Sequence, residues 1–391
     1  MTKKMNLIVV PVLILMLFMF QAVIMAANAA DQPDPKTLKK ITKLMKKGDE
    51  KAKKNEFDKA FELYNKVLEL STEYAPVYLS MARVYEKQKK FDTAIENLEK
   101  AVDIQPDFTD AIRMLTKNLI GMGKQAASRK QLEKSNQYYL KVLEIPGIKN
   151  AANDQLIEAI FQLGFNYPRL NNPTRSNEYL FKLLAFPGLE TSDKGKFVKA
   201  SYQIGVNYFK LKEFEKAEEY LSKLVKVDGL KTNFLQVYTI SHYLAGLNAR
   251  QLENYKKSNA YFSEYLEVTQ NNPSDQFRPA VNFMLGSNNY NLLQKKVEAI
   301  KSEKKEDMRK RVAALAKETK NIQPYLSKAI ELNPSLEPAY LILGNYYFLC
   351  QDYENAMQLY NRLIEKFPDS QDIETYKRFL KDIEKESKQE K

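Results

Sequence analysis

Side chains able to support catalysis or metal binding are scarce in this sequence of 391 residues, which has one histidine, His242, and one cysteine, Cys350. A histidine can act as a general base or a metal ligand near neutral pH, and a cysteine thiolate can act as a nucleophile. Neither has a second residue of its kind to form a pair, and a single cysteine excludes an intramolecular disulfide. Because Cys350 ends an apolar stretch at residues 346–350, we expect a small buried side chain.

Motifs for phosphate, metal or acyl chemistry are also missing from the sequence. It contains no G-x-x-x-x-G-K-[ST] loop, no H-E-x-x-H helix and no G-x-S-x-G elbow. We therefore predict a protein that is not an enzyme, with no catalytic residue, no cofactor and no metal, whose function depends on the surface that its helices build.

A pattern of 34 residues organises the chain. It is complete in residues 75–108 and again in residues 337–370, where aromatic, apolar and small side chains and a proline share the positions 4, 7, 8, 11, 17, 20, 24, 27 and 32. Their spacing predicts pairs of amphipathic helices. The matching residues are Tyr78, Met81, Ala82, Tyr85, Phe91, Ala94, Leu98, Ala101 and Pro106 in the first segment, and Tyr340, Leu343, Gly344, Tyr347, Tyr353, Ala356, Tyr360, Leu363 and Pro368 in the second.

The glycines recur in register with this pattern. Position 8 is glycine in seven repeats, and from residue 123 to residue 286 these glycines are 41 or 40 residues apart: Gly48, Gly123, Gly164, Gly205, Gly246, Gly286 and Gly344. Position 20 is small: Ala60, Ala94, Ser135, Ser176, Ala217, Ser258 and Ala356. A glycine inside a helix costs about 1 kcal/mol relative to alanine, so we expect close contact between paired helices there. A second series follows helix ends, where glycine adopts the left-handed conformation: Gly147, Gly188 and Gly229.

These repeats resemble the tetratricopeptide family over about residues 41–370. The resemblance implies an all-α fold, an α-solenoid in which about eight antiparallel helix hairpins stack into a right-handed superhelix, with the first helices lining a concave groove. His242 then occupies position 4 of the sixth repeat, where a packed ring is expected. A capping helix and tail are expected in residues 371–391, with one apolar face: Ile373, Tyr376, Phe379, Leu380 and Ile383.

Three departures from the family pattern carry further expectations. The seven extra residues of the 41-residue central repeats equal about two helical turns, so we expect a lengthened helix. The seventh repeat has about 24 residues beyond a standard hairpin, which predicts a helical insertion near residues 292–322 that projects as an arm, with a flexible charged loop as the alternative. Lys47 and Lys51 replace apolar residues in the first repeat, as a terminal repeat requires.

The N-terminal residues have the features of an export signal. Lys3 and Lys4 precede an apolar run at residues 7–20, and A-N-A at residues 27–29 offers small residues to a signal peptidase. We expect a signal peptide at residues 1–29, a linker at 30–40, and an exported protein that is periplasmic or extracellular. The alternative is an uncleaved inner-membrane anchor, because the apolar stretch can be extended to about 20 residues.

The net charge of +12 is concentrated in two segments. Residues 36–59 carry 10 basic and 4 acidic side chains, and residues 295–320 carry 10 and 5. Such segments can bind anionic polymers or a membrane face, which is the alternative function, but lysines interleaved with glutamates on helices are more typical of solvated faces. No nucleic-acid motif is present, and we predict no nucleic-acid partner.

The predicted function is that of a protein-binding scaffold or adaptor of the cell envelope. The resemblance implies that positions 2, 5, 9, 12 and 13 of each first helix face a ligand, which predicts a peptide-binding groove: Phe161, Phe165, Tyr202, Val206, Phe209, Tyr243, Leu247, Arg250 and Phe283. Aromatic residues beside an arginine are typical of interaction hot spots. The alternative is that these rings pack against one another. The sequence predicts neither the partner's identity nor the oligomeric state.

Overall fold

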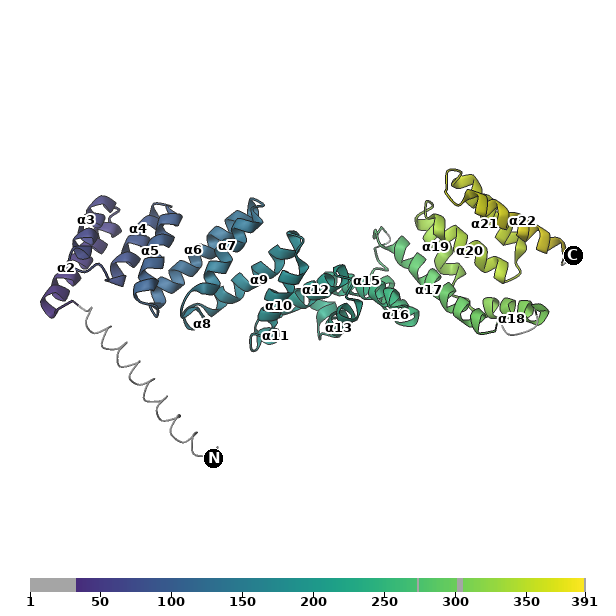
Figure 1. Cartoon of the computed structure of the whole chain (residues 1–391), viewed down its shortest axis with the longest axis horizontal. Helices are drawn as coiled ribbons and strands as arrows, with labels where there is room; N and C mark the ends of the chain where they lie inside the picture. The colour runs from purple at the N-terminus through teal and green to yellow at the C-terminus, as the bar shows by residue number, and fades with distance from the viewer. Residues whose placement is uncertain (1–32, 273, 301–304, 390–391) are drawn as a thin grey trace, which may run out of the picture. The chain divides into compact units, whose positions relative to one another are not determined.

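The computed structural model describes residues 33–272, 274–300 and 305–389, and within these ranges the chain forms 21 helices and no strand. The described helices divide into two compact units, those up to residue 170 (unit 1) and those from residue 171 onward (unit 2). Each unit stacks antiparallel helix hairpins in chain order, so the expected all-α solenoid is confirmed (Figure 1). The superhelical hand remains a prediction, and the expected signal peptide lies outside the described residues.

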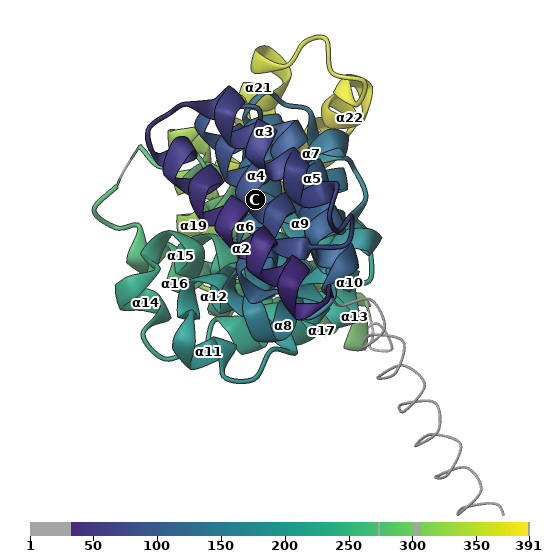
Figure 2. The same cartoon turned by 90° about the vertical axis from the view of Figure 1, so that its left-hand side faces the viewer.

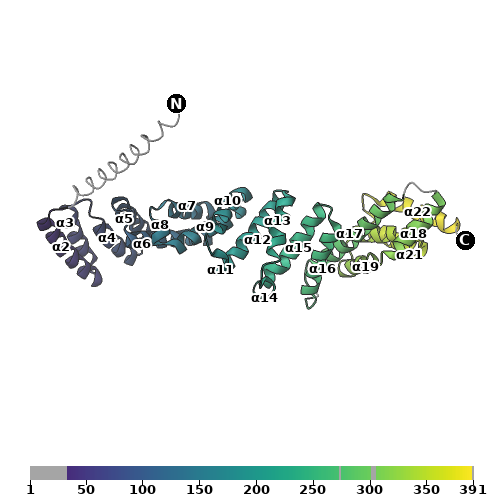
Figure 3. The ribbon, with the colours of Figure 1, turned by 90° about the horizontal axis from the view of Figure 1, so that it is seen from below.

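Unit 1 contains three hairpins and a further helix that packs on the third hairpin. Figure 3 shows these hairpins following one another along the unit. The elements are α2 (Pro35–Lys53) with α3 (Phe57–Leu68), α4 (Ala75–Lys87) with α5 (Phe91–Ile104), α6 (Thr109–Ser128) with α7 (Leu132–Glu144), the short α8 (Ile148–Ala151), and α9 (Asn153–Arg169).

Unit 2 begins with a single helix, continues with four hairpins and ends with one more helix. The elements are α10 (Pro173–Leu184), α11 (Leu189–Ser192), α12 (Lys194–Lys210) with α13 (Phe214–Leu224), α14 (Leu230–Asn233), α15 (Leu235–Gln251) with α16 (Tyr255–Val268), α17 (Arg278–Ala299) with α19 (Gln323–Leu332), the inserted α18 (Lys305–Glu318), α20 (Glu337–Leu349) with α21 (Tyr353–Lys366), and α22 (Ile373–Gln389).

Position 8 is a point of close approach between the two helices of a hairpin. A Cβ atom added at Gly246 would lie 2.5 Å from the ring of Phe262 on the paired helix. The expected close contact is therefore confirmed, and the side chain at position 24 fills the space that the glycine leaves. The same contact recurs in both units: Gly48 with Tyr64, Gly123 with Tyr139, Gly205 with Leu221 and Gly344 with Tyr360.

The expectation that the seven extra central residues only lengthen a helix is wrong. They also form separate four-residue helices, α8, α11 and α14, each preceded by a glycine with φ of 68° to 72° and each starting with a buried residue: Ile148, Leu189 and Leu230. The left-handed glycine ends the preceding helix, which therefore cannot continue. Figures 2 and 3 show α11 and α14 on the same side of unit 2. The first helices α9, α12 and α15 are nonetheless 17 residues long, compared with 13 for α4 and α20.

The insertion in the seventh repeat is helical in the described residues, but it does not project as an arm. α19 completes the hairpin with α17, since a Cβ atom at Gly286 would lie 2.6 Å from Leu326. α18 folds back onto this part of unit 2, where Ala316 is fully buried in the C-terminal hydrophobic core. Arg309 of α18 donates to both carboxylate oxygens of Glu386 on α22, at 3.0 and 2.9 Å. The apolar face of α18 is buried by this packing, which a projecting arm would leave in water.

The two outermost helices begin and end differently from the expected boundaries. α2 starts at Pro35, inside the expected linker, and the Asp34 carboxylate caps it by accepting hydrogen bonds from the amides of Lys36 and Thr37. At the other end α22 buries Tyr376 and Ile383 against the last hairpin, so the expected capping helix is confirmed. It continues to Gln389, so almost all of the expected segment at residues 371–391 is helical in the described residues.

Candidate functional site

The nine predicted groove residues lie on the first helices of successive hairpins. Phe161 and Phe165 belong to α9 of unit 1. The other seven belong to α12, α15 and α17 of unit 2: Tyr202, Val206, Phe209, Tyr243, Leu247, Arg250 and Phe283. All nine side chains are half-buried, so each contacts the core and keeps part of its surface in solvent.

In unit 1 the two phenylalanines form one aromatic surface. The ring centroids of Phe161 and Phe165, one helical turn apart on α9, are 4.6 Å apart with the planes tilted by 35°. Residues four apart on a helix share a face, so the rings stabilise each other while both stay partly exposed.

In unit 2 the two tyrosines combine a packed ring with an unpaired hydroxyl. The ring centroid of Tyr243 lies 4.7 Å from that of Phe277 and 5.8 Å from that of Tyr265, and Tyr202 packs against a cluster that contains Leu230. Burial raises the pKa of both Tyr202 and Tyr243, so their phenols stay protonated near neutral pH. Among the described residues neither hydroxyl has a hydrogen-bond partner, which leaves both able to donate to a ligand.

Arg250, which was predicted to face a ligand in the groove, forms hydrogen bonds within the fold. Its guanidinium reaches the next hairpin, where it donates to Asn288 Oδ1 and to Ser287 Oγ, the latter at 3.1 Å. Burial lowers the pKa of Arg250, although an arginine stays charged at any physiological pH. Arg250 therefore contributes to the contact between successive hairpins in unit 2.

Buried asparagines form a second recurring contact between hairpins, which we call the asparagine joint. In unit 2 the side-chain amide of Asn288, fully buried on α17, donates to Ser258 Oγ at 2.8 Å and to Asn259 Oδ1 at 2.9 Å on α16. The same bonds join Asn207 to Ser176 and Asn177 in unit 2, and Asn166 to Ser135 and Asn136 in unit 1.

The fourth asparagine joint shows what the serine and asparagine acceptors contribute. Ala217 and Glu218 replace them in the fifth repeat, and Asn248 instead donates to the Phe214 carbonyl at 3.0 Å and to Glu218 at 3.2 Å. These joints were not predicted from the sequence. The signal was present as G-x-N at positions 8 to 10 of four successive repeats, with an S-N dipeptide 29 to 31 residues before the asparagine in three of them.

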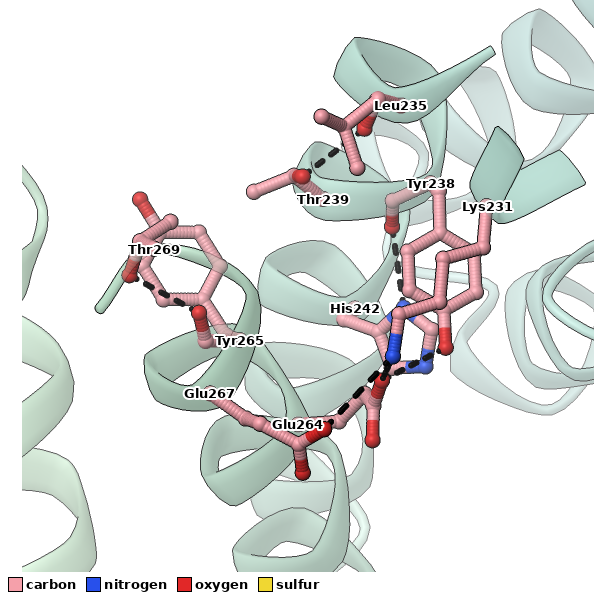
Figure 4. Close-up of polar contacts among 9 residues, drawn as sticks. All are labelled: Lys231, Leu235, Tyr238, Thr239, His242, Glu264, Tyr265, Glu267 and Thr269. Atoms are coloured by element: carbon pink, nitrogen blue, oxygen red, sulfur yellow. Dashed lines mark hydrogen bonds and ion pairs between the residues drawn. The ribbon is translucent and has the colours of Figure 1, made fainter. Parts of the chain in front are cut away.

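His242 lies in a polar cluster built by α14, α15 and α16 (Figure 4). Its Nδ1 donates to the Tyr238 carbonyl at 2.9 Å, while Glu264 Oε1 accepts from the Tyr238 hydroxyl at 2.8 Å and from Lys231 Nζ at 2.9 Å. The imidazole packs between the rings of Tyr238 and Tyr261, and burial lowers its pKa. The expected packed ring is confirmed, and the cluster ties the short helix α14 to the hairpin that follows it.

Cys350 is also a packed side chain, as expected. It is buried at the end of α20 beside Tyr346, and burial raises the pKa of its thiol, which favours the unreactive form. Among the described residues no group of three or more histidine, cysteine, aspartate or glutamate side chains is placed to hold a metal ion.

The two basic segments carry ion pairs in their described parts. In the first, Glu56 pairs with Lys51 at 3.0 Å and with Lys59 at 2.8 Å. In the second, Lys295 pairs with Glu253 at 3.0 Å, and Arg309 takes part in the contact with α22 described above. Part of the basic charge of each segment is therefore already neutralised within the fold.

Family models of the tetratricopeptide repeat match three segments of the chain, residues 52–119, 198–229 and 338–370. No curated protein matches the chain. The solved structures that are similar include YrrB, described as a TPR protein with an unusual peptide-binding site, at 15% identity over 54% of this chain and 93% of that one, with a TM-score of 0.34.

Two further solved structures cover more of the chain. The C-terminal part of a TPR repeat-containing protein from Cytophaga hutchinsonii is 16% identical over 76% of this chain and 99% of that one, with a TM-score of 0.38. The TPR domain of P58(IPK) is 18% identical over 89% and 99%, with a TM-score of 0.29. Since all three TM-scores are below 0.5, the repeat type rests on the family-model matches.

Proposed function

Because the chain is a tetratricopeptide-repeat protein, we propose that it is a non-catalytic scaffold that binds a peptide segment of a protein partner along the first helices of its hairpins. One observation carries the proposal: in unit 2, Tyr202 and Tyr243 on successive first helices present half-buried rings with unpaired hydroxyls. A ring held in place by its neighbours gives contact area at a small entropy cost, and its hydroxyl adds a directed hydrogen bond.

The apolar residues one helical turn after these tyrosines support the same role. Val206 and Leu247 lie on the same two helices, and Phe283 continues the row onto α17, where it packs at the edge of the C-terminal core. Tyrosines flanked by half-buried aliphatic side chains suit a peptide with apolar anchors, in extended or helical form. Arg250 is engaged in the contact between hairpins, so this surface relies on aromatic and aliphatic side chains more than on charge.

We also propose that the protein acts in the cell envelope. The support is the sequence of residues 1–29, which lie outside the described residues. Within the described residues no helix is both long and apolar enough to cross a membrane. The alternative function, in which the basic segments bind an anionic polymer, is less well supported because several of their cations are already paired.

The test is affinity capture of partners from an envelope extract with the chain from which residues 1–29 have been removed (the mature chain) and with a Tyr202→Leu, Tyr243→Leu double variant of it. Leucine retains most of the packed volume and removes both the ring and the hydroxyl. We expect partners to be lost from the double variant and retained by a Phe181→Leu, Tyr220→Leu control, which removes two rings from the second helices α10 and α13.

Two measurements complete this test. Circular dichroism should show the same helical content in all three proteins, which excludes unfolding as the cause of a loss. Binding through an aromatic and apolar surface should change little between low and physiological salt. Identical capture by the mature chain and the double variant would remove the proposal.

A further inference from the structure

We propose that unit 1 carries a second binding site, a hollow between its second and third hairpins that takes a short acidic segment of a partner protein. This basic hollow has a volume of about 530 Å³ and is lined by residues of the α4–α5 turn, the end of α6 and the start of α7. It contains none of the predicted groove residues and does not depend on the function proposed above.

Positive charge is the dominant chemical feature of the basic hollow. Lys89, Lys90, Arg129 and Lys134 line it and are all exposed. None of the four forms an ion pair with a carboxylate of the described residues, whereas at the α2–α3 turn of the same unit Glu56 pairs with both Lys51 and Lys59. Four unpaired cations around one hollow, with Asp92 as the only acid of its lining, create a local positive potential that attracts carboxylates.

Apolar surface lies between these cations. Phe91 is 40% exposed, and Met122 and Tyr138, which line the same hollow, are half-buried. Burial and the neighbouring Asp92 raise the pKa of Tyr138, so its phenol is a neutral hydrogen-bond donor. A ligand that matches this lining combines carboxylates with at least one apolar side chain, which is the chemistry of an acidic peptide.

The basic hollow opens where the contact between hairpins changes. At position 10 of the first helix, the second repeat has the buried Val84 and the fourth has the buried Asn166, and both fill the space against the preceding hairpin. The third repeat has Gln125 at this position, which is exposed and lines the hollow. The space beside α5 is therefore left open at this place in the unit.

The charge is confined to this place, which favours a short peptide over a long polyanion. The residue before the second helix is Lys90 at the hollow, but at the corresponding turns of unit 2 it is neutral or acidic: Asn172, Glu213, Asn254 and Asp352. Nucleic acids and anionic membranes bind through many contacts spread along a track or a face. One hollow of limited size fits a few side chains of a protein segment better.

The experiment uses fluorescence anisotropy with the mature chain and a short labelled peptide of aspartate and glutamate residues around one phenylalanine. We expect saturable binding that weakens steeply with salt. A Lys90→Glu, Arg129→Glu double variant should lose about tenfold or more in affinity. The matched control is Lys210→Glu, Lys212→Glu, which makes the same charge change at a hairpin turn of unit 2 and should bind like the unchanged chain.

Each other outcome counts against the proposal. Equal affinity for a peptide with glutamine and asparagine in place of the acids, or an equal loss in both double variants, would show that the basic hollow does not recognise acidic residues. Tighter binding of polyphosphate or of vesicles with anionic lipid than of the peptide would assign the charge to a polyanion. The Tyr202→Leu, Tyr243→Leu variant should bind the peptide normally, which separates this site from the groove.

Discussion

The central and the outer repeats connect their hairpins by different chemistry. In the central repeats a buried asparagine such as Asn288 donates two hydrogen bonds to the preceding hairpin, and a left-handed glycine and a short helix precede most of the first helices. In two outer repeats, the second and the last, position 10 is apolar or aromatic and buried, as Val84 and Tyr346, and no short helix precedes their first helices among the described residues.

This difference indicates what fixes the register between successive hairpins. Apolar contacts are nondirectional and tolerate small shifts, whereas an amide that donates to two acceptors fixes one hairpin against the next. The central repeats are longer and interrupted by turns, so they offer more ways to slip. We infer that the asparagine joints hold their register, while the outer repeats rely on apolar packing.

The largest expected effect is at an asparagine joint. Asn288→Leu removes the hydrogen bonds of Ser258, Asn259 and Arg250 with this side chain, while these three groups stay at least partly buried. Because buried polar groups without partners are costly, the free energy of unfolding should fall by about 3 kcal/mol. Val84→Ile adds one methylene to the corresponding apolar contact and should cost about 1 kcal/mol. Urea unfolding followed by circular dichroism measures both, and equal losses would remove the distinction between the two kinds of joint.

The next effect tests a feature that central and outer repeats share. Gly246→Ala places a methyl group 2.5 Å from the ring of Phe262 and should cost about 2 kcal/mol of unfolding free energy. Gly344→Ala meets Tyr360 at 2.9 Å and should cost less. Gly121→Ala is the control, because nothing lies within 4 Å of its Cβ, and it should raise stability by about 0.5 to 1 kcal/mol.

A pH dependence should distinguish the sixth repeat from the outer ones, which have Tyr78 and Tyr340 where it has His242. Burial lowers the folded-state pKa of His242 below its unfolded value of 6.5, so the unfolded chain binds the proton first as the pH falls. The stability contributed by neutral His242 is present above pH 6.5 and is lost below it. The unfolding free energy of the native chain minus that of His242→Phe should therefore fall by about 1 kcal/mol when the pH is lowered from 7.5 to 5.5.

Glu264 offers the internal control for that measurement. Its hydrogen bonds with Lys231 and Tyr238 lower its pKa from 4.5, so its contribution is present above pH 4.5 and is lost only in more acidic solution. If the difference in unfolding free energy between the native chain and His242→Phe changed only below pH 4.5, the role given to His242 would be contradicted.

The smallest effects concern the turns. Gly188 has φ of 72°, and an added Cβ atom would make only an ordinary contact with Thr191 Oγ1 at 3.8 Å, so Gly188→Ala should cost about 1 kcal/mol through backbone strain. Lys212 adopts φ of 60° in the turn within a hairpin, and Lys212→Gly should gain up to about 0.5 kcal/mol. Thermal unfolding measures both changes, and a gain at Gly188→Ala would contradict the conformational argument.

Much of the fold could be predicted from the sequence, and less of the candidate site. The recurrence of Gly246 opposite Phe262 follows from spacing alone, because the two helices of a hairpin are close in sequence. The placement of α18 against α20 and α22 could not be predicted from spacing, because this contact joins segments that are far apart in the chain. The exposure of Tyr202 and the engagement of Arg250 with Asn288 depend on how neighbouring hairpins meet.

The sequence by itself determined the repeat, the helix pairs and the small residues between them, since helix periodicity and glycine conformation are local properties. The tertiary structure decided where the seven extra residues go, which asparagines are buried, and where the space between hairpins stays open as the basic hollow. Those outcomes depend on which side chains of neighbouring hairpins contact each other. Where the contact is a buried hydrogen bond, its loss leaves a polar group without a partner, which is costly.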